Sequence, residues 1–319
     1  MSRSGLNSLR QLARLEWGDY PPTPGRLIYL LKLKFGHGLR AAWYRDVIRP
    51  QILATPAVRT TDDTCEIHVL TSQGDWLNLM WALKSFYFHS GRRYSLCIHD
   101  DGTLDETARN ALCAAFPDAR LISRDEADRC VIPLLAGFPR GRELRAANTL
   151  ALKVFDFRAF LGAERMMIFD SDILFFAEPT ALLRILETSG RNSLNRDWRD
   201  GYTLDFGAVG PVLDFELPSR INSGLGLIHK SSLRYDWIEE FLALPGILSH
   251  PHQIEQTLIA LCSAKFGFSM LPEEYDVHTG PRRAGIPCRH YTGPIRHLMY
   301  REGMRELAAQ GILEASALS

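Results

Sequence analysis

The chain has 319 residues, of which 46% are hydrophobic, so it can bury one large core or two ordinary ones without disulfides. Lysine plus arginine and aspartate plus glutamate both total 37, and this neutral balance argues against a nucleic-acid partner. No apolar run approaches the ~20 residues of a membrane-spanning helix, and Met1-Ser2-Arg3-Ser4 does not open a signal peptide, so we expect a cytoplasmic protein.

Residues 1–60 form the first predicted unit, a basic helical extension. They carry ten basic and three acidic side chains, whereas the chain as a whole is neutral. Leucines recur at every third position from Leu6 to Leu15, and a second apolar segment over 27–33 follows a turn rich in proline. Two interpretations remain open: the extension lies on the inner face of an anionic membrane, or it packs on the domain that we place at 61–319.

The six cysteines show no C-x-x-C spacing. Most lie among apolar residues, which is typical of buried thiols in a reducing compartment rather than of a disulfide framework or a zinc site. They are Cys65, Cys97, Cys113, Cys130, Cys262 and Cys288.

From residue 61 onward, apolar runs with the spacing of strands alternate with amphipathic helical segments. Thr103 and Glu106 have the spacing of a capping box at the start of one of these helices. Such alternation predicts an α/β fold with a mainly parallel sheet. We expect strands over 67–70, 96–98 and 120–122, and helices over 76–87 and 103–116.

A long helical and basic stretch over 125–160 leads to the central strand. Four apolar residues, Met166 to Phe169, predict a strand buried on both faces, and Asp170-Ser171-Asp172 follows where that strand leaves the sheet. Carboxylates in so apolar a setting need a partner, and the carboxyl end of a central strand is where α/β proteins bind ligands. The pair therefore indicates a divalent metal. The alternative is that both residues cap a helix or face water.

We expect a helix over 179–187 and a surface loop over 189–220. Three segments after them contain candidate site residues. Asn222 and Gly224 open an apolar strand and suit close contact with a sugar, although a bulge explains them equally well. Glu255 and Gln256 begin a helix, where an acidic first turn is ordinary. His290 suits a manganese or magnesium site with two carboxylates, and Arg296 suits a phosphate.

These motifs, in this order, resemble the retaining GT-A glycosyltransferases of family eight and their bacterial relatives. The resemblance covers about residues 65–298 and includes Asp170-Ser-Asp172, Asn222-Ser-Gly224, Glu255-Gln256 and His290-x-x-Gly293-x-x-Arg296. It implies a Rossmann-like GT-A fold, a nucleotide-diphosphate sugar donor, with a UDP-sugar favoured, and Mn²⁺ or Mg²⁺. The chain departs from the family after residue 295, where Arg296-His297-Leu298 replaces the usual Lys-Pro-Trp.

The resemblance also implies roles for individual residues. Asp170, Asp172 and His290 would hold the metal, with Asp170 and Asp172 also near the ribose, and Arg296 would bind the diphosphate. Glu255 or Gln256 would lie near the reacting sugar carbon. The remaining donor-binding candidates are basic or polar residues before the central strand and after the first two strands, together with the residues of the Asn222 motif: Thr71, Asp100, Asp101, Arg145, Lys153, Asn222 and Gly224.

The sequence leaves the reaction outcome open. Retention is expected from the resemblance, whereas a Glu255 that reaches the acceptor hydroxyl as a base would give inversion. A haloacid-dehalogenase-like phosphohydrolase, with Asp170 as nucleophile, is one alternative, and an inactive sugar-nucleotide-binding protein is another. The sequence does not identify the acceptor, for which a glycan, a lipid-linked acceptor and a protein all stay open.

Overall fold

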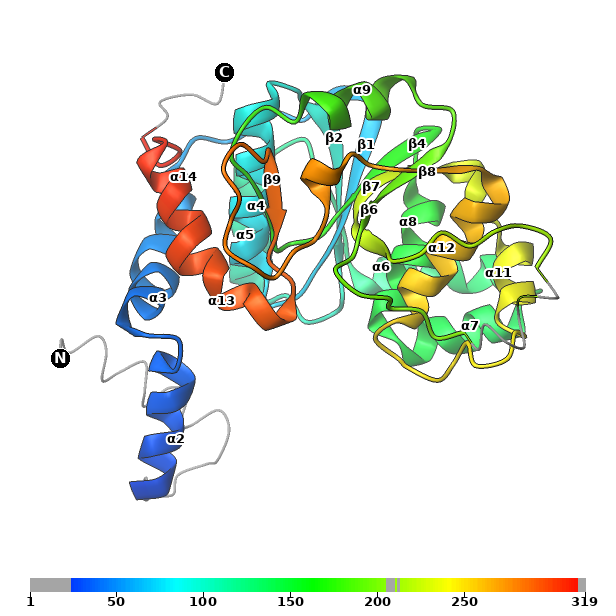
Figure 1. Ribbon diagram of the computed structural model, residues 1–319, viewed down its shortest axis with the longest axis horizontal. Coiled ribbons are helices and arrows are strands. Elements are labelled where there is room, and N and C mark those ends of the chain that lie inside the picture. The colour runs from blue at the N-terminus through cyan, green and yellow to red at the C-terminus, as the bar shows by residue number, and fades with distance from the viewer. Residues whose placement is uncertain (1–23, 205–209, 211–212, 315–319) are drawn as a thin grey trace.

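The computed structural model describes residues 24–204, 210 and 213–314, and its centre is a seven-stranded mixed sheet (Figure 1). The strand order is β3-β2-β1-β4-β7-β6-β8. Neighbouring strands run parallel except around β7, which is antiparallel to both β4 and β6. The α/β class and the mainly parallel sheet predicted from the sequence are thus confirmed.

The strands cover the segments predicted from the apolar runs, and additional strands are present. The large sheet consists of β1 (Asp62–Thr71), β2 (Tyr94–Asp100), β3 (Arg120–Ile122), β4 (Arg165–Phe169), β6 (Asn192–Arg196), β7 (Ile221–His229) and β8 (Phe268–Met270). A small antiparallel sheet consists of β5 (Ile173–Phe175) and β9 (Cys288–His290).

Helices cover both faces of the large sheet. One face packs on α4 (Trp76–Ser90), α5 (Glu106–Ala115), α9 (Thr180–Thr188) and the C-terminal helices η7 (Met299–Met304) and α14 (Arg305–Ala309). The other face packs on α6 (Arg124–Leu134), α7 (Pro139–Ala147), α8 (Leu152–Phe160), α11 (Tyr235–Phe241) and α12 (Ile254–Phe266). Short turns η3 (Thr149–Ala151), η4 (Lys230–Ser232), η5 (Glu273–Tyr275), η6 (Gly293–Ile295) and α13 (Arg296–Leu298) connect them.

The central strand β4 joins the two cores. Met167 and Phe169 belong to the core under α4, whereas Met166 and Ile168 belong to the core under α8 and α12. All four side chains are fully buried, as the unbroken apolar run predicted. The strand is therefore fixed on both faces, and it ends at the acidic pair.

Two local predictions were wrong. The helix α5 is capped by Asp105, whose side chain accepts a hydrogen bond from the Ala108 amide, because Thr103 is instead hydrogen-bonded to Asp101 and to the Gln73 amide. The segment 189–220 is not only loop, since β6 lies within it and pairs with both β7 and β8. Polar residues hide this strand in the sequence: the Asn192 amide group binds two buried serine hydroxyls, so the side chain is satisfied inside the sheet.

The N-terminal region described is helical, as expected: its first helix projects from the body of the molecule (Figure 1), whereas its last two helices pack on α4 and η7. Its elements are α2 (Pro24–Phe35), α3 (Leu39–Trp43), the π-helical η1 (Tyr44–Ile48) and the 3₁₀-helical η2 (Arg49–Ala54). The predicted leucine repeat over 6–15 lies outside the described residues, and the boundary at residue 60 stays a prediction. Among the described helices, none is long and apolar enough to cross a membrane.

Candidate functional site

A cavity of about 360 Å³ opens at the edge of the sheet where β1 and β4 end and β7 begins. Parallel strands place their carboxyl ends together, and β7 contributes its first residues to the same edge because it runs antiparallel to β4. Polar and charged side chains dominate the lining: Thr71, Ser72, Asp75, Asp101, Lys153, Asp170, Ser171, Asp172, Asn222, Ser223, His252, Glu255, Gln256, His290, Thr292 and Arg296.

The small sheet brings His290 to the acidic pair. β5 and β9 pair so that Ile173 faces His290, and the Tyr291 amide donates to the Asp172 carbonyl at 2.8 Å. The His290 Nε2 atom then lies 2.9 Å from Asp172 Oδ1 and 3.8 Å from Asp170 Oδ2. Two segments that are more than a hundred residues apart therefore form one acidic and imidazole cluster.

Charge governs the two buried members of this cluster. Burial opposes ionisation of Asp172, but His290 and Arg296 outweigh it and hold the pKa of that carboxyl at about 2. Burial also opposes the charged form of His290, yet the neighbouring Asp172 raises the pKa of the imidazole above its ordinary value. In the metal-free protein the two groups thus form a buried ion pair, with Asp172 about 5% exposed.

A divalent metal could replace the proton that His290 shares with Asp172 in this ion pair. One ligand atom from each of Asp170, Asp172 and His290 lies within 4.8 Å of the others. Two carboxylates and an imidazole are ligand types that manganese and magnesium sites use. Gly224 leaves the space they need, because a Cβ atom there would lie 2.4 Å from His290 Cε1 and 2.8 Å from Asp170 Oδ2. The residues present can therefore hold Mn²⁺ or Mg²⁺.

A buried lysine connects the acidic pair to α12. The Lys153 ammonium lies 2.8 Å from Asp170 Oδ1 and 3.3 Å from Glu255 Oε1, and it donates to the Ser223 carbonyl. Burial lowers the pKa of Lys153, but the two carboxylates outweigh it and raise that pKa above its usual value. Burial raises the pKa of Glu255. Glu255 also accepts a hydrogen bond from the Ser223 hydroxyl, so both of its oxygens face protein partners.

Gln256 and Asn222 present neutral amides beside the cavity. Gln256 is half-buried, and it contacts the Ser223 amide and the Gly201 carbonyl at 3.4 Å each. Asn222 donates to Asp197 and accepts from the Gly224 amide, at 2.9 Å in each case. The contacts of Gln256 are long, so its amide can exchange them for those of a ligand at little cost.

Arg296 closes the opposite side of the cavity. Its guanidinium donates to both oxygens of Asp75, at 3.0 and 3.2 Å, and to Asp172 Oδ2 at 2.7 Å. These carboxylates raise the pKa of Arg296 despite its burial, so the side chain is a permanent cation. It remains 39% exposed, and therefore it can reach an anion in the cavity.

The structure brings most predicted donor-binding residues to this cavity, but not all of them. Thr71 and Asp101 line it, and the Gly224 backbone supports it by accepting the Asp170 amide at 2.9 Å. Asp100 is turned inward to the amides of its own loop and to Arg109. Arg145 lies in a bidentate ion pair with Asp156 and also contacts Asp128. Neither Asp100 nor Arg145 lines the cavity, so their predicted contact with the donor has no geometric support.

Several functional candidates were missed in the sequence. Asp75 lies directly before α4, and the available signal was a carboxylate between the first predicted strand and the first predicted helix. Ser223 lies between Asn222 and Gly224 and contacts Lys153, Glu255 and Gln256. A second cavity, of about 340 Å³, adjoins the first and shares His252, Gln256, Thr292 and Gly293 with it. Its other lining residues are Asp197, Trp198, Arg199, Gly201, His250, Gln253 and Pro294.

Comparison with known proteins places this geometry in a fold class. Neither a protein-family model nor a curated protein sequence matches the chain. Among solved structures, a galactosyltransferase, LgtC, in complex with donor and acceptor sugar analogues is 16% identical, over 77% of this chain and 95% of that one, with a TM-score of 0.54. The chain therefore has the GT-A glycosyltransferase fold predicted from its motifs.

Two further glycosyltransferase structures are similar at lower scores. Mouse xyloside xylosyltransferase 1 is 10% identical, over 72% of this chain and 98% of that one, with a TM-score of 0.48. The mannosyltransferase Ktr4p from S. cerevisiae is 9% identical over the whole of both chains, with a TM-score of 0.47.

Proposed function

We propose that this protein is a metal-dependent glycosyltransferase that moves a sugar from a nucleoside-diphosphate donor to an acceptor. One observation carries the proposal: Asp170, Asp172 and His290 converge at the carboxyl edge of a GT-A sheet. The fold similarity to a galactosyltransferase with donor and acceptor analogues supports the same reaction class. The choice of a UDP-sugar as the donor rests on the sequence resemblance alone.

The chemistry requires stabilisation of charge on the departing diphosphate. A metal held by Asp170, Asp172 and His290 would supply Lewis-acid stabilisation of that charge. Arg296 supplies a second cation, because it can turn from Asp172 and Asp75 toward phosphate oxygens and bind them in a bidentate way. Lys153 stays beneath Asp170, where it offsets the negative charge of the acidic pair and fixes the position of that carboxylate.

Retention is the outcome that the geometry of α12 favours. A base for inversion needs an oxygen that is free to accept the acceptor's proton. Glu255 is only about 3% exposed, and its oxygens face Lys153 and Ser223, so it is a poor candidate for that base. Gln256 is neutral, half-buried and part of both cavities, which suits a group that faces the reacting sugar carbon. The acceptor would then occupy the second cavity.

A panel of nucleotide sugars tests the proposed reaction. The true donor should raise the midpoint of thermal unfolding in the presence of Mn²⁺, because binding stabilises the folded state by mass action. It should also be turned over only when Mn²⁺ is present, releasing a nucleoside diphosphate. Release of phosphate from phosphomonoesters, with no turnover of any sugar nucleotide, would support the hydrolase instead. Donor binding without turnover in the presence of candidate acceptors would support an inactive binding protein.

The N-terminal helices support a second, separate proposal, peripheral contact with an anionic membrane. Apolar side chains that would ordinarily be buried are exposed there together with Lys32 and Arg40. The full chain should therefore sediment with vesicles of anionic lipid and not with zwitterionic ones. Equal sedimentation with both, or with neither, contradicts this contact. The exposed apolar residues are Ile28, Tyr29, Leu31, Leu39, Trp43, Val47 and Leu53.

A further inference from the structure

A second group of metal-ligating side chains lies inside the sheet. His68 is on β1, and Cys97 and His99 are on the neighbouring strand β2. His68 is the register partner of Cys97, and His99 lies two residues further along the same strand. Side chains of register partners share a face, and so do residues two apart, so all three point to one side of the sheet.

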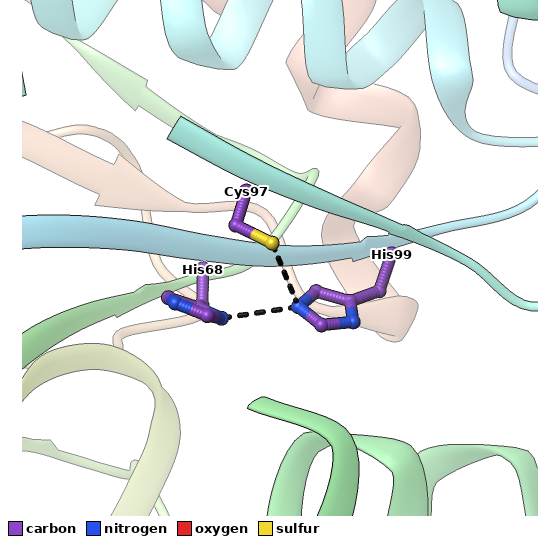
Figure 2. A group of neighbouring side chains, drawn as sticks. All are labelled: His68, Cys97 and His99. Carbon is purple, nitrogen blue, oxygen red and sulfur yellow. Dashed lines mark hydrogen bonds between the residues drawn. The ribbon is translucent and has the colours of Figure 1, made fainter. Parts of the chain in front are cut away.

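The His68 ring and the Cys97 thiol both contact the His99 ring. Figure 2 shows the thiol of Cys97 and the ring of His68 both directed at the same nitrogen of His99. The His68 Nδ1 atom lies 3.0 Å from His99 Nε2, and Cys97 Sγ lies 3.4 Å from it. All three ligand atoms lie within 4.8 Å of one another.

Two of the three spacings are close to those between ligand atoms of a tetrahedral zinc ion, and the three side chains would fill three of its four positions. Bond lengths of about 2.0–2.1 Å to nitrogen and about 2.3 Å to sulfur separate two ligand nitrogens by about 3.3 Å, and a nitrogen from a sulfur by about 3.5 Å. The His68–His99 and Cys97–His99 spacings are each within a few tenths of an ångström of these values.

The surroundings resemble those of a built metal site. Glu66 Oε2 lies 3.3 Å from the outer nitrogen of His68, and a carboxylate on the outer nitrogen is the usual partner of a metal-bound histidine. Glu66 is itself held by Arg120 and by the Gly162 amide. On the other side, the His99 ring packs against Phe157, with 4.6 Å between ring centroids.

The chemistry of the cluster separates it from the site at the sheet edge. His68 and Cys97 are completely buried, and His99 is about 2% exposed. Metals bind the neutral form of an imidazole and the thiolate form of a cysteine. A thiolate and two imidazoles favour zinc, whereas the carboxylates of Asp170 and Asp172 favour manganese or magnesium.

We propose that His68 Nδ1, Cys97 Sγ and His99 Nε2 form a zinc site that joins strands β1 and β2. On binding, the Cys97 thiol loses its proton to solvent, and the thiolate and both neutral imidazoles donate electron pairs to Zn²⁺ with no change of oxidation state. Glu66 offsets the remaining positive charge. We assign the site a structural role, since His68 and His99 pack against Phe157 of α8 and none of the three residues lines the cavity. This inference is independent of the proposed function, and it revises the expectation that Cys97 is only a buried thiol.

Cobalt substitution provides the test. The full chain, purified without a tag and dialysed against EDTA, is titrated with Co²⁺, because a thiolate ligand gives a sulfur-to-cobalt charge-transfer band that carboxylates and imidazoles alone do not give. We expect this band to saturate at one equivalent of Co²⁺ and to disappear when Zn²⁺ is added. The Cys97→Ser variant should lose the band and bind Zn²⁺ at least about 10-fold more weakly. The matched variant Cys262→Ser, a buried thiol of α12 outside the cluster, should keep both properties.

Asp172→Asn separates this site from the acidic one, since it should keep the band. No charge-transfer band in the unmodified chain would overturn the proposal, and so would a band that survives in Cys97→Ser. If circular dichroism shows that Cys97→Ser does not fold, X-ray absorption on zinc-loaded Asp172→Asn protein tests the ligands instead. One sulfur and two imidazole nitrogens around zinc support the site, and a shell without sulfur overturns it.

Discussion

The two clusters of ligand atoms in this fold differ in position, and that difference decides their chemistry. The cluster of Asp170, Asp172 and His290 stands at the open edge of the sheet, where Lys153 and Arg296 balance its charge and a ligand can enter. The cluster of His68, Cys97 and His99 is enclosed between the sheet and α8. An open edge suits an exchangeable metal and a substrate, and a closed interior suits a permanent metal that holds two strands together.

Removing one carboxylate should break the edge site and leave the interior one intact. We expect Asp172→Asn to lower Mn²⁺-dependent turnover of a nucleotide sugar at least about 100-fold, because the substitution removes the charge of a metal ligand that is also one of the two carboxylate partners of Arg296. The measurement is nucleoside-diphosphate release as a function of Mn²⁺. Asp118→Asn, which alters a carboxylate that pairs with Arg59 and does not line the cavity, is the control. Full activity in Asp172→Asn contradicts the proposed metal role.

Filling the space beside the edge cluster should weaken metal binding without removing a ligand. The methyl group of Gly224→Ala would collide with His290 and Asp170, so we expect Mn²⁺ affinity to fall by about 10–100-fold. Gly280→Ala is the matched control, because nothing lies within 4 Å of a Cβ at that position. Titration with Mn²⁺ by electron paramagnetic resonance measures both. Equal affinities would show that the cluster is not the metal site.

Replacing Arg296, the positively charged side chain of the edge site, should separate the effect on donor binding from the effect on metal binding. We expect Arg296→Ala to weaken donor binding about 10-fold, with a smaller loss for Arg296→Lys, since lysine keeps the charge but not the bidentate geometry. Mn²⁺ affinity should change less than donor affinity. Isothermal titration with the donor, once identified, and with Mn²⁺ separates the two effects. A donor affinity unchanged in Arg296→Ala would rule out its contact with the diphosphate.

The smallest expected effect is the pH dependence of thermal stability, which comes from His290 when no metal is bound. The pKa of His290 is raised in the folded protein above the ordinary 6.5, so its ion pair stabilises the fold fully below that value and is lost as pH rises through the raised pKa. In EDTA, the midpoint of thermal unfolding should therefore fall as pH rises above about 6.5. His290→Gln should reduce this slope. Mn²⁺ affinity should change in the opposite sense, rising with pH as the imidazole loses its proton.

The sequence predicted the frame of the site because the relevant signals are local. A short unbroken apolar run is typical of a strand buried on both faces, and the two carboxylates directly after it were therefore expected at the carboxyl edge of the sheet, where they lie. The order of the motifs then indicated the GT-A fold, which the similarity to a solved galactosyltransferase confirms. Local signals failed where side-chain partners were distant: Asp100 and Arg145 have the right residue types, but Arg109 and Asp156 hold them away from the cavity.

By itself, then, the sequence determined the alternating strands and helices, the buried central strand and the acidic pair at its end. Only the tertiary structure decided which distant groups meet those carboxylates, because the pairing of β5 with β9 spans more than a hundred residues and places His290 against Asp172. The register of β1 and β2 likewise set His68 against Cys97 and His99. Hydrophobic periodicity fixes the face of each strand, whereas the register between strands fixes which side chains touch.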